Sequence, residues 1–123
     1  MKNNLKKSEL IISPEFGIYS NLYKDIYFDK YHGIKETQHN FLKANNLAYR
    51  FKKSDKFVIS ELGFGTGLSF LMTLKLWKKT KKPNAKLIFI SFESAPLTKI
   101  ELKQVYKNVK GLKILSSQLI KKL

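Results

Sequence analysis

The chain has 123 residues, no cysteine, and a formal net charge of +15 from 24 lysine and arginine residues against 9 acidic ones. The length allows one domain at most, and the absence of cysteine excludes a disulfide framework and a thiolate metal site. No apolar run approaches membrane-spanning length, and the N-terminus lacks the apolar core of a signal peptide, so we expect a globular, cytoplasmic protein without a membrane partner.

The basic excess favours a polyanionic partner such as RNA, bound in a salt-dependent way. Nearly all of the basic residues are lysines, and Arg50 is the only arginine. Arginine is the residue suited to bidentate phosphate recognition. Since asparagine and isoleucine are also abundant, a general compositional drift toward lysine is the competing explanation.

The N-terminal third of the chain shows strand-like patterns followed by a helical one. Leu10 to Pro14 predicts a short strand or an extended lead-in, and alternating aromatic and polar residues from Phe16 to Phe28 predict a β-hairpin or flap. Thr37 is the expected N-cap of a helix that runs to about Phe51, with Asn45 and Asn46 as a potential break.

Residues 56–67 form the stretch around which the chain is organised. Lys56 to Leu62 is an apolar run with β-branched residues, as in a central parallel strand, and it leads into a turn with Gly63, Gly65 and Gly67. Leu68 to Trp77 then has helical periodicity. A strand, a glycine turn and a helix make the first half of a nucleotide-binding βα unit.

The glycine spacing indicates which ligand this unit takes. A dinucleotide fingerprint requires glycine at 68, where the chain has Leu68, and the observed pattern is Glu-x-Gly-x-Gly-x-Gly from Glu61 to Gly67. This form is typical of S-adenosylmethionine-dependent methyltransferases. Glycines let the backbone approach a cofactor closely, and Glu61 is placed to anchor its ammonium group directly or through water. The alternative is an ordinary glycine-rich turn that Glu61 merely caps.

A second acid follows the next apolar run. Lys86 to Phe92 predicts another buried strand, and Glu93 comes directly after it, 26 residues beyond Gly67. In βαβ nucleotide sites an acid at this strand tip accepts hydrogen bonds from the ribose hydroxyls, roughly 20 residues after the glycines. A loop from Lys78 to Pro83 accounts for the longer gap. A solvated strand end is the alternative, and the position favours the ribose role.

The remaining residues predict two helices and no further strand. Thr98 and Glu101 form a capping-box pattern for a helix that stops near Gly111, and residues 112–123 read as a short helix. His32 and His39 lack the neighbouring carboxylates and the spacing of a metal site, so no metal is expected. Two parallel strands are too few for a doubly wound sheet. We expect an α/β fold in which an N-terminal hairpin and helix extension, residues 1–55, precedes the truncated first half of a Rossmann-like domain, residues 56–123.

Taken together, these segments resemble the methyltransferase domain that completes 5-methylaminomethyl-2-thiouridine at the tRNA wobble position, the MnmC N-terminal or MnmD family. The resemblance covers residues 13 to 123. The matching stretches are Ser13-Pro14, Asp25 to Phe28, Gly33 to Thr37, Asn40 to Leu42 with Asn45, Leu47, Arg50 and Phe51, then Glu61 to Leu71, Phe89 to Glu93, and Pro96 to Thr98.

The resemblance implies a class I methyltransferase fold, preceded by the extension, that binds S-adenosylmethionine and methylates the aminomethyl nitrogen of the wobble uridine in tRNA. It implies that one set of residues lines the cofactor crevice: Glu61, Gly63, Gly65, Thr66, Gly67 and Glu93, with Tyr27, Phe28, Glu36 and Asn45.

The resemblance also implies parts that these residues do not supply. In the family, the carboxylate that accepts the amine proton lies in a downstream Asp-x-Phe-x-Pro-type segment that this sequence lacks. The catalytic residue is therefore left unassigned, and the isolated chain is expected to be inactive. The second half of the sheet and the flavin-dependent (FAD) oxidase domain of some members are the expected additional parts. The alternative functions are a non-catalytic remnant or a basic RNA-binding module, and more weakly a NAD-dependent oxidoreductase, against which Leu68 argues.

Overall fold

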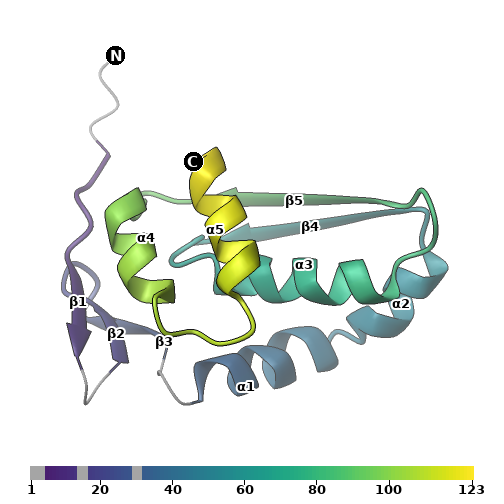
Figure 1. Cartoon of the computed structure of the whole chain (residues 1–123), viewed down its shortest axis with the longest axis horizontal. Helices are drawn as coiled ribbons and strands as arrows, with labels where there is room; N and C mark the ends of the chain where they lie inside the picture. The colour runs from purple at the N-terminus through teal and green to yellow at the C-terminus, as the bar shows by residue number, and fades with distance from the viewer. Residues whose placement is uncertain (1–4, 14–16, 29–31) are drawn as a thin grey trace.

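A computed structural model of the chain describes residues 5–13, 17–28 and 32–123. The described elements form two separate sheets with helices packed between and beside them (Figure 1). None of the helices in these ranges has the length and apolar character needed to cross a membrane.

The N-terminal sheet has three antiparallel strands in the order β1-β2-β3. They span Leu10–Ser13, Gly17–Ser20 and Asp25–Phe28. The predicted strand and hairpin are thereby confirmed, although Pro14 and Phe16 lie outside the described residues. Ile18 and Ser20 of β2 are almost fully buried, so this sheet packs onto the rest of the molecule through its middle strand.

The helical segment that follows begins earlier than the sequence predicts. Helix α1 spans Gly33–Thr37 and runs directly into a π-helix, η1, over Gln38–Lys43. The predicted N-cap at Thr37 is wrong, because this residue has helical dihedral angles (φ −59°, ψ −41°) inside the continuous segment and makes no capping hydrogen bond with its side chain. The break at the two asparagines is confirmed: Asn46 is left-handed (φ 51°), and α2 starts after it, spanning Leu47–Lys53.

The second sheet carries the predicted βα unit. Strands β4 (Lys56–Leu62) and β5 (Lys86–Phe92) are parallel, with Lys56 opposite Lys86 and Leu62 opposite Phe92. Helix α3, Leu68–Thr80, connects them, so the loop expected from Lys78 begins only after Thr80. The predicted domain boundary between residues 55 and 56 falls at the start of β4, and the division into two domains stays a prediction.

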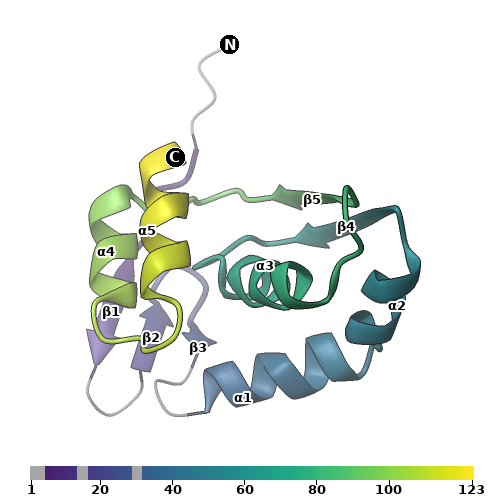
Figure 2. The same cartoon turned by 45° about the vertical axis from the view of Figure 1, so that its right-hand side comes forward.

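The last two helices lie beside the carboxyl ends of β4 and β5 (Figures 1 and 2). Helix α4 spans Lys99–Tyr106 and therefore ends before the predicted stop near Gly111, whereas α5 spans Lys113–Lys122, within the predicted residues 112–123. The capping box is present, with the Thr98 side chain accepting from the Glu101 backbone N–H and the Glu101 carboxylate accepting from the backbone N–H of Thr98.

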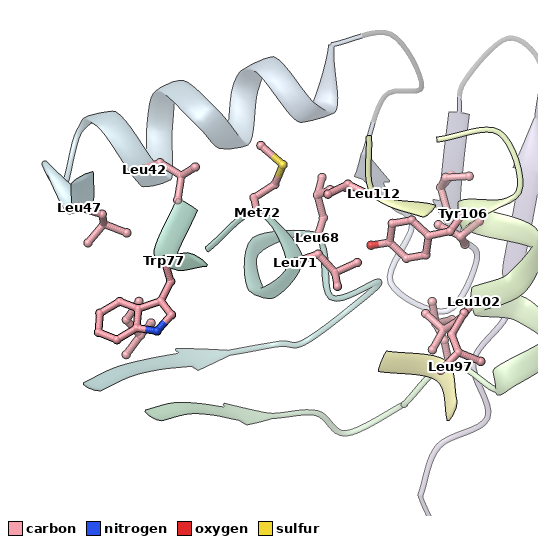
Figure 3. Packing of buried hydrophobic residues seen from close by; sticks show 14 of the residues in the cluster. Leu42, Leu47, Leu68, Leu71, Met72, Trp77, Leu97, Leu102, Tyr106 and Leu112 are labelled. Atoms are coloured by element: carbon pink, nitrogen blue, oxygen red, sulfur yellow. The ribbon is translucent and has the colours of Figure 1, made fainter. Parts of the chain in front are cut away.

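The core lies between the sheet and the helices α2 and α3 and continues under α4 and α5. Phe51 is fully buried, and its ring meets the rings of Phe57 and Trp77 edge to face at centroid distances of 4.9 and 5.0 Å. Figure 3 shows how Trp77 and Leu71 of α3 point into the space beside the strands. We call the side of the sheet that carries Phe57 and Ile59 its inner face.

The opposite side of β4 and β5 has no cover among the described residues. Leu62 is 88% exposed and Phe92 61% exposed, and α3 lies on the other side of the strands in Figures 1 and 2. We call this side the outer face; its large apolar side chains are Val58, Leu62, Ile88, Ile90 and Phe92. Parallel strands are normally covered on both faces.

Candidate functional site

The glycine turn between β4 and α3 has a backbone that side chains rarely adopt. Gly63, Gly65 and Gly67 have φ values of +85°, +54° and +76°. A Cβ atom on Gly67 would lie 2.7 Å from the Phe64 ring, and one on Gly65 would lie 3.1 Å from the Tyr27 ring. The glycines are therefore required both for the turn itself and for the close approach of neighbouring rings.

Glu93 binds the glycine turn from the end of the neighbouring strand. Its Oε2 accepts a hydrogen bond of 2.8 Å from the backbone N–H of Gly65, and its Oε1 accepts one of 2.8 Å from Ala95. The Gly63 N–H also donates to the carbonyl of Phe92, at 2.7 Å. The two strand ends are thus joined into one rigid rim, with the acid at its centre.

Glu61 adds a second carboxylate to this rim. It is partly buried near the end of β4 and accepts a hydrogen bond of 3.0 Å from the Ser91 hydroxyl. Burial raises the pKa of Glu61, and the nearby charge of Glu93 raises it further, although the Ser91 hydrogen bond opposes both. Two carboxylates that disfavour each other's charge make a site suited to a cation and to hydroxyl donors.

Tyr27 approaches the same rim from the N-terminal sheet. Its ring borders Gly65, and the negative charge of Glu93 acts on its hydroxyl group. Burial raises the pKa of Tyr27 and Glu93 raises it further, against the opposing hydrogen bond with Ser20. Phe28, the next residue, ends β3 opposite Ile18.

Two cavities border Gly65 or its neighbours. One, of about 540 Å³, lies among β3, α1, η1 and the start of α3; its lining includes Ile26, Tyr27, Glu36, Asn40, Phe41 and Ser69. The second, of about 320 Å³, is mainly apolar; its lining includes Phe64, Gly65, Pro96, Leu97 and Leu102. The turn therefore lines the mainly apolar cavity directly, and Tyr27, whose ring borders Gly65, lines the other, which is the more polar of the two.

The structure gathers most, but not all, of the residues predicted for the cofactor. Glu61, Glu93, Tyr27 and the glycines meet at the rim, and Glu36 lines the cavity that Tyr27 shares. Asn45 lies instead between η1 and α2, where its amide donates to the Phe41 carbonyl at 2.7 Å, and it is not part of that lining.

Two supporting residues were missed because neither carries a local sequence signal. Ser91 orients Glu61, as described above, and Tyr106 holds the turn from α4 by donating its hydroxyl hydrogen to the carbonyl of buried Thr66 at 2.9 Å. Burial raises the pKa of Tyr106, which keeps this hydroxyl protonated. In the sequence Tyr106 is simply one more residue on an apolar helix face.

Within residues 5–13, 17–28 and 32–123, no group of three or more His, Asp or Glu side chains is arranged to hold a metal ion. The site is thus built from backbone N–H groups, two carboxylates and aromatic rings.

No protein-family model matches the chain. Its sequence is 43% identical over 104 residues to the tRNA 5-methylaminomethyl-2-thiouridine biosynthesis bifunctional protein MnmC of Marinomonas sp. (strain MWYL1), and this match covers 83% of the chain and 15% of the relative. The MnmC of Aeromonas salmonicida (strain A449) is 44% identical over 96 residues, covering 74% of the chain and 13% of the relative. The chain therefore spans about a seventh of the length of these relatives.

Among solved structures, the chain is similar to MnmC2 from Aquifex aeolicus, with a TM-score of 0.72. That match covers 98% of the chain and 39% of the solved chain at 18% sequence identity, which shows the fold. The predicted fold class, a fragment of a Rossmann-like α/β fold preceded by an extension, is confirmed.

Proposed function

Because the chain belongs to the MnmC family and matches one part of its members, we propose that it is the cofactor-binding part of the S-adenosylmethionine-dependent methyltransferase that acts on the aminomethyl nitrogen of the tRNA wobble uridine. The observation that carries the proposal is the rim at which Glu61, Gly65 and Glu93 meet. We propose a cytoplasmic location as well, on the ground that tRNA is the proposed substrate.

The chemistry of the rim fits this cofactor. S-adenosylmethionine supplies a methyl group on a positively charged sulfur when it is bound. Glu61 would hold the ammonium group, whose positive charge opposes the burial and the repulsion from Glu93 that together raise the pKa of Glu61. Glu93 would accept the ribose hydroxyls, since each carboxylate oxygen has a second lone pair beyond the one used for Gly65 or Ala95.

The cavities on either side suggest how the rest of the crevice is used. The apolar cavity beside Gly65 suits an uncharged base, and it borders the residues that follow Glu93. Tyr27 and Glu36 line the polar cavity and remain proposed cofactor residues there. Phe28 and Asn45 remain proposed cofactor residues on the family resemblance alone. Thr66 is proposed as one because it belongs to the glycine turn.

Two other functions are weaker candidates. A dinucleotide oxidoreductase needs glycine at position 68, but Leu68 is 7% exposed and belongs to the core. A non-catalytic RNA-binding module would use the lysine-rich surface and leave the rim without a role. Binding of S-adenosylmethionine is expected for the proposed function and for neither of these two.

We further propose that the remaining part of the methyltransferase fold covers the outer face. More than half of the Aquifex aeolicus chain has no counterpart here, and the outer face is the apolar surface that such strands and helices require. A second copy of this chain fits less well, because two chains that each carry a net charge of +15 repel each other. The covering part would supply the acid that takes the proton from the amine, and a FAD-dependent domain is a further possible partner.

The cofactor proposal is tested by calorimetric titration of S-adenosylmethionine into the 123-residue chain. Glu93→Gln and Glu61→Gln should each weaken binding about tenfold or more, as expected when a charge-assisted hydrogen bond of about 1.5–3 kcal/mol is lost. Glu9→Gln removes an exposed carboxylate away from the rim and should leave the affinity unchanged. Binding of NADH in place of S-adenosylmethionine would contradict the proposal, as would equal affinities for all four proteins.

The covering proposal is tested by thiol labelling, which the chain permits because it has no cysteine of its own. Leu62→Cys, Phe92→Cys and the control Ile114→Cys are each placed in the chain alone and in a fusion to a cysteine-free version of the Marinomonas segment that follows the matched 104 residues. In the fusion, labelling should slow at least tenfold at positions 62 and 92 and stay unchanged at 114, which is 74% exposed on α5. Unchanged rates at 62 and 92 would contradict the proposal.

A further inference from the structure

A second, chemically different groove lies between α4 and α5. It has a volume of about 530 Å³, and four of the residues that line it are lysines: Lys103, Lys107, Lys113 and Lys121. Ser116 and Ser117 add hydroxyl groups to the lining, and the buried side chains of Tyr106 and Ile120 contribute to its floor. The groove therefore combines the positive charge of its lysines with a lining that is otherwise mainly apolar.

The sequence after Glu101 is basic throughout. Residues 102–123 contain six lysines and no aspartate or glutamate. Among the described residues, none of the four groove lysines forms an ion pair, whereas Lys82, far from the groove, pairs with Asp55 at 3.1 Å. Four uncompensated ammonium groups around one concave surface repel each other, so an anion that binds between them relieves that repulsion.

The spacing of the lysines suits a linear polyanion. Lys103 lies in α4 and Lys107 is the C-cap residue of that helix, with helical dihedral angles, so the two lie on one side about one turn apart. Lys113 and Lys121 are eight residues apart on α5, about two turns. Lysine acts on phosphate as a point charge, without the planar fork with which arginine recognises particular geometries. Such rows favour a phosphodiester backbone, bound without regard to base sequence.

The groove is also attached to the glycine turn. Tyr106 in its lining donates to the Thr66 carbonyl, and Leu119 of α5 would be 3.3 Å from a Cβ atom on Gly67. Helices α4 and α5 lie beside the carboxyl ends of β4 and β5 (Figures 1 and 2), so a chain of phosphates along them would pass beside the proposed cofactor site.

We propose that the groove between α4 and α5 binds the phosphodiester backbone of tRNA and so brings the wobble nucleotide toward the cofactor rim. This inference rests on the proposed function for the identity of the RNA. An anionic membrane is a poorer fit, because membrane-surface binding requires apolar side chains that insert beside the lysines, and those of the groove are buried.

The test compares two variants of the 123-residue chain with the same net charge. One changes Lys103, Lys107, Lys113 and Lys121 to glutamine. The control changes Lys78, Lys79, Lys81 and Lys86 to glutamine. These lysines are exposed and lie where α3 ends and β5 begins, at the end of the sheet away from the groove. Affinity for unmodified bacterial tRNA is measured by fluorescence anisotropy over a series of salt concentrations, and S-adenosylmethionine affinity is measured on the same proteins.

Each lysine that contacts a phosphate contributes about 0.7–0.9 to the slope of log affinity against log salt, so the groove variant should lose a slope of about 3. It should also bind tRNA at least tenfold more weakly at low salt, while the control stays within about threefold of wild type. Equal losses in both variants would overturn the inference, because only net charge would then matter. Tighter binding of poly-glutamate or anionic phosphatidylserine vesicles than of tRNA at the groove would also overturn it.

Cofactor binding separates the two proposals. Unchanged S-adenosylmethionine affinity together with equal tRNA affinities in both variants would refute the groove and leave the proposed function intact. Loss of tRNA binding in the groove variant alone, in a chain that fails to bind S-adenosylmethionine, would support the groove and refute the cofactor proposal.

Discussion

The two faces of the β4–β5 sheet carry similar side chains but have different surroundings. On the inner face Phe57 and Ile59 are each 9% exposed, whereas Val58 on the outer face of the same strand is 52% exposed. Phe51 and Trp77 close the inner face with edge-to-face ring contacts. The difference shows that helices cover the inner face, whereas none of the described residues covers the outer one.

This asymmetry separates the two requirements of the proposed enzyme. The glycine turn, Glu61 and Glu93 are held by contacts inside the chain, with Ser91 and Tyr106 in support. The cofactor rim is thus prepared without the outer layer. Methyl transfer also needs a carboxylate that accepts the proton lost by the amine. The proposed source of this carboxylate is the part that covers the outer face.

Loss of packing on the inner face should have the largest effect on the stability of the chain. Phe51→Ala removes a fully buried ring that contacts both Phe57 and Trp77, so it should lower the free energy of unfolding by about 3–5 kcal/mol or leave the chain unfolded. Urea denaturation followed by circular dichroism measures this. The control Ile114→Ala, on an exposed site, should change it by less than about 0.5 kcal/mol. A loss below about 1 kcal/mol for Phe51→Ala would mean that the inner face is not the core.

Gly67→Ala tests the junction between the sheet and α3. Alanine at φ +76° is strained by about 1–2 kcal/mol, and its Cβ atom would press on the Phe64 ring. Denaturation of this variant should therefore occur at lower urea. Gly63→Ala is the comparison, because its φ of +85° carries similar strain and open space surrounds the position. Gly67→Ala should be the less stable of the two, and the reverse order would contradict the described turn.

Glu61→Gln should stabilise the cofactor-free chain at neutral pH. Since burial raises the pKa of Glu61 in the folded state, stability that is present below its ordinary pKa is lost as pH rises through the raised value. Glutamine does not titrate and can still accept from Ser91. The advantage of the variant should thus appear above the raised pKa and vanish in more acidic solution. Thermal melts across pH 3–8 measure this, and an advantage that grows toward acid would contradict the assignment.

The outer face should show the smallest change in stability. Leu62→Gln with Phe92→Gln replaces two exposed apolar side chains and should shift the free energy of unfolding of the isolated chain by less than about 0.5 kcal/mol per site. The same pair should weaken association with the covering segment, as measured by sedimentation of a mixture, while Ile114→Gln should not. A large destabilisation of the isolated chain would mean that the outer face already has a cover.

The sequence predicted the βα unit well because its signals are local. The apolar run before Gly63 and the helical spacing after Gly67 each fix their own element, and the tip of the second strand brings Glu93 to Gly65 as expected. The start of α1 was missed because Gly33, a poor helix former, is buried and packed in place by tertiary contacts. The exposure of Val58 and Leu62 was also beyond prediction, since strands that are apolar on both sides do not reveal which side is covered.

The lysine groove shows another limit of sequence reasoning. Lys103 and Lys121 belong to different helices, and only the packing of α4 against α5 brings them to one cavity. From the sequence alone their charge was part of a general excess of lysine.

The most direct test of the central claim is a thermal melt of the 123-residue chain with and without S-adenosylmethionine, beside Gly65→Asp. A rim that is prepared within this chain predicts one cooperative transition that rises with cofactor, by about 2.7 kcal/mol of stabilisation at a concentration 100 times the dissociation constant. Gly65→Asp, whose side chain would meet the Tyr27 ring and the Glu93 carboxylate, should show no such rise. A cooperative melt that the cofactor leaves unchanged in the wild-type chain would contradict the claim.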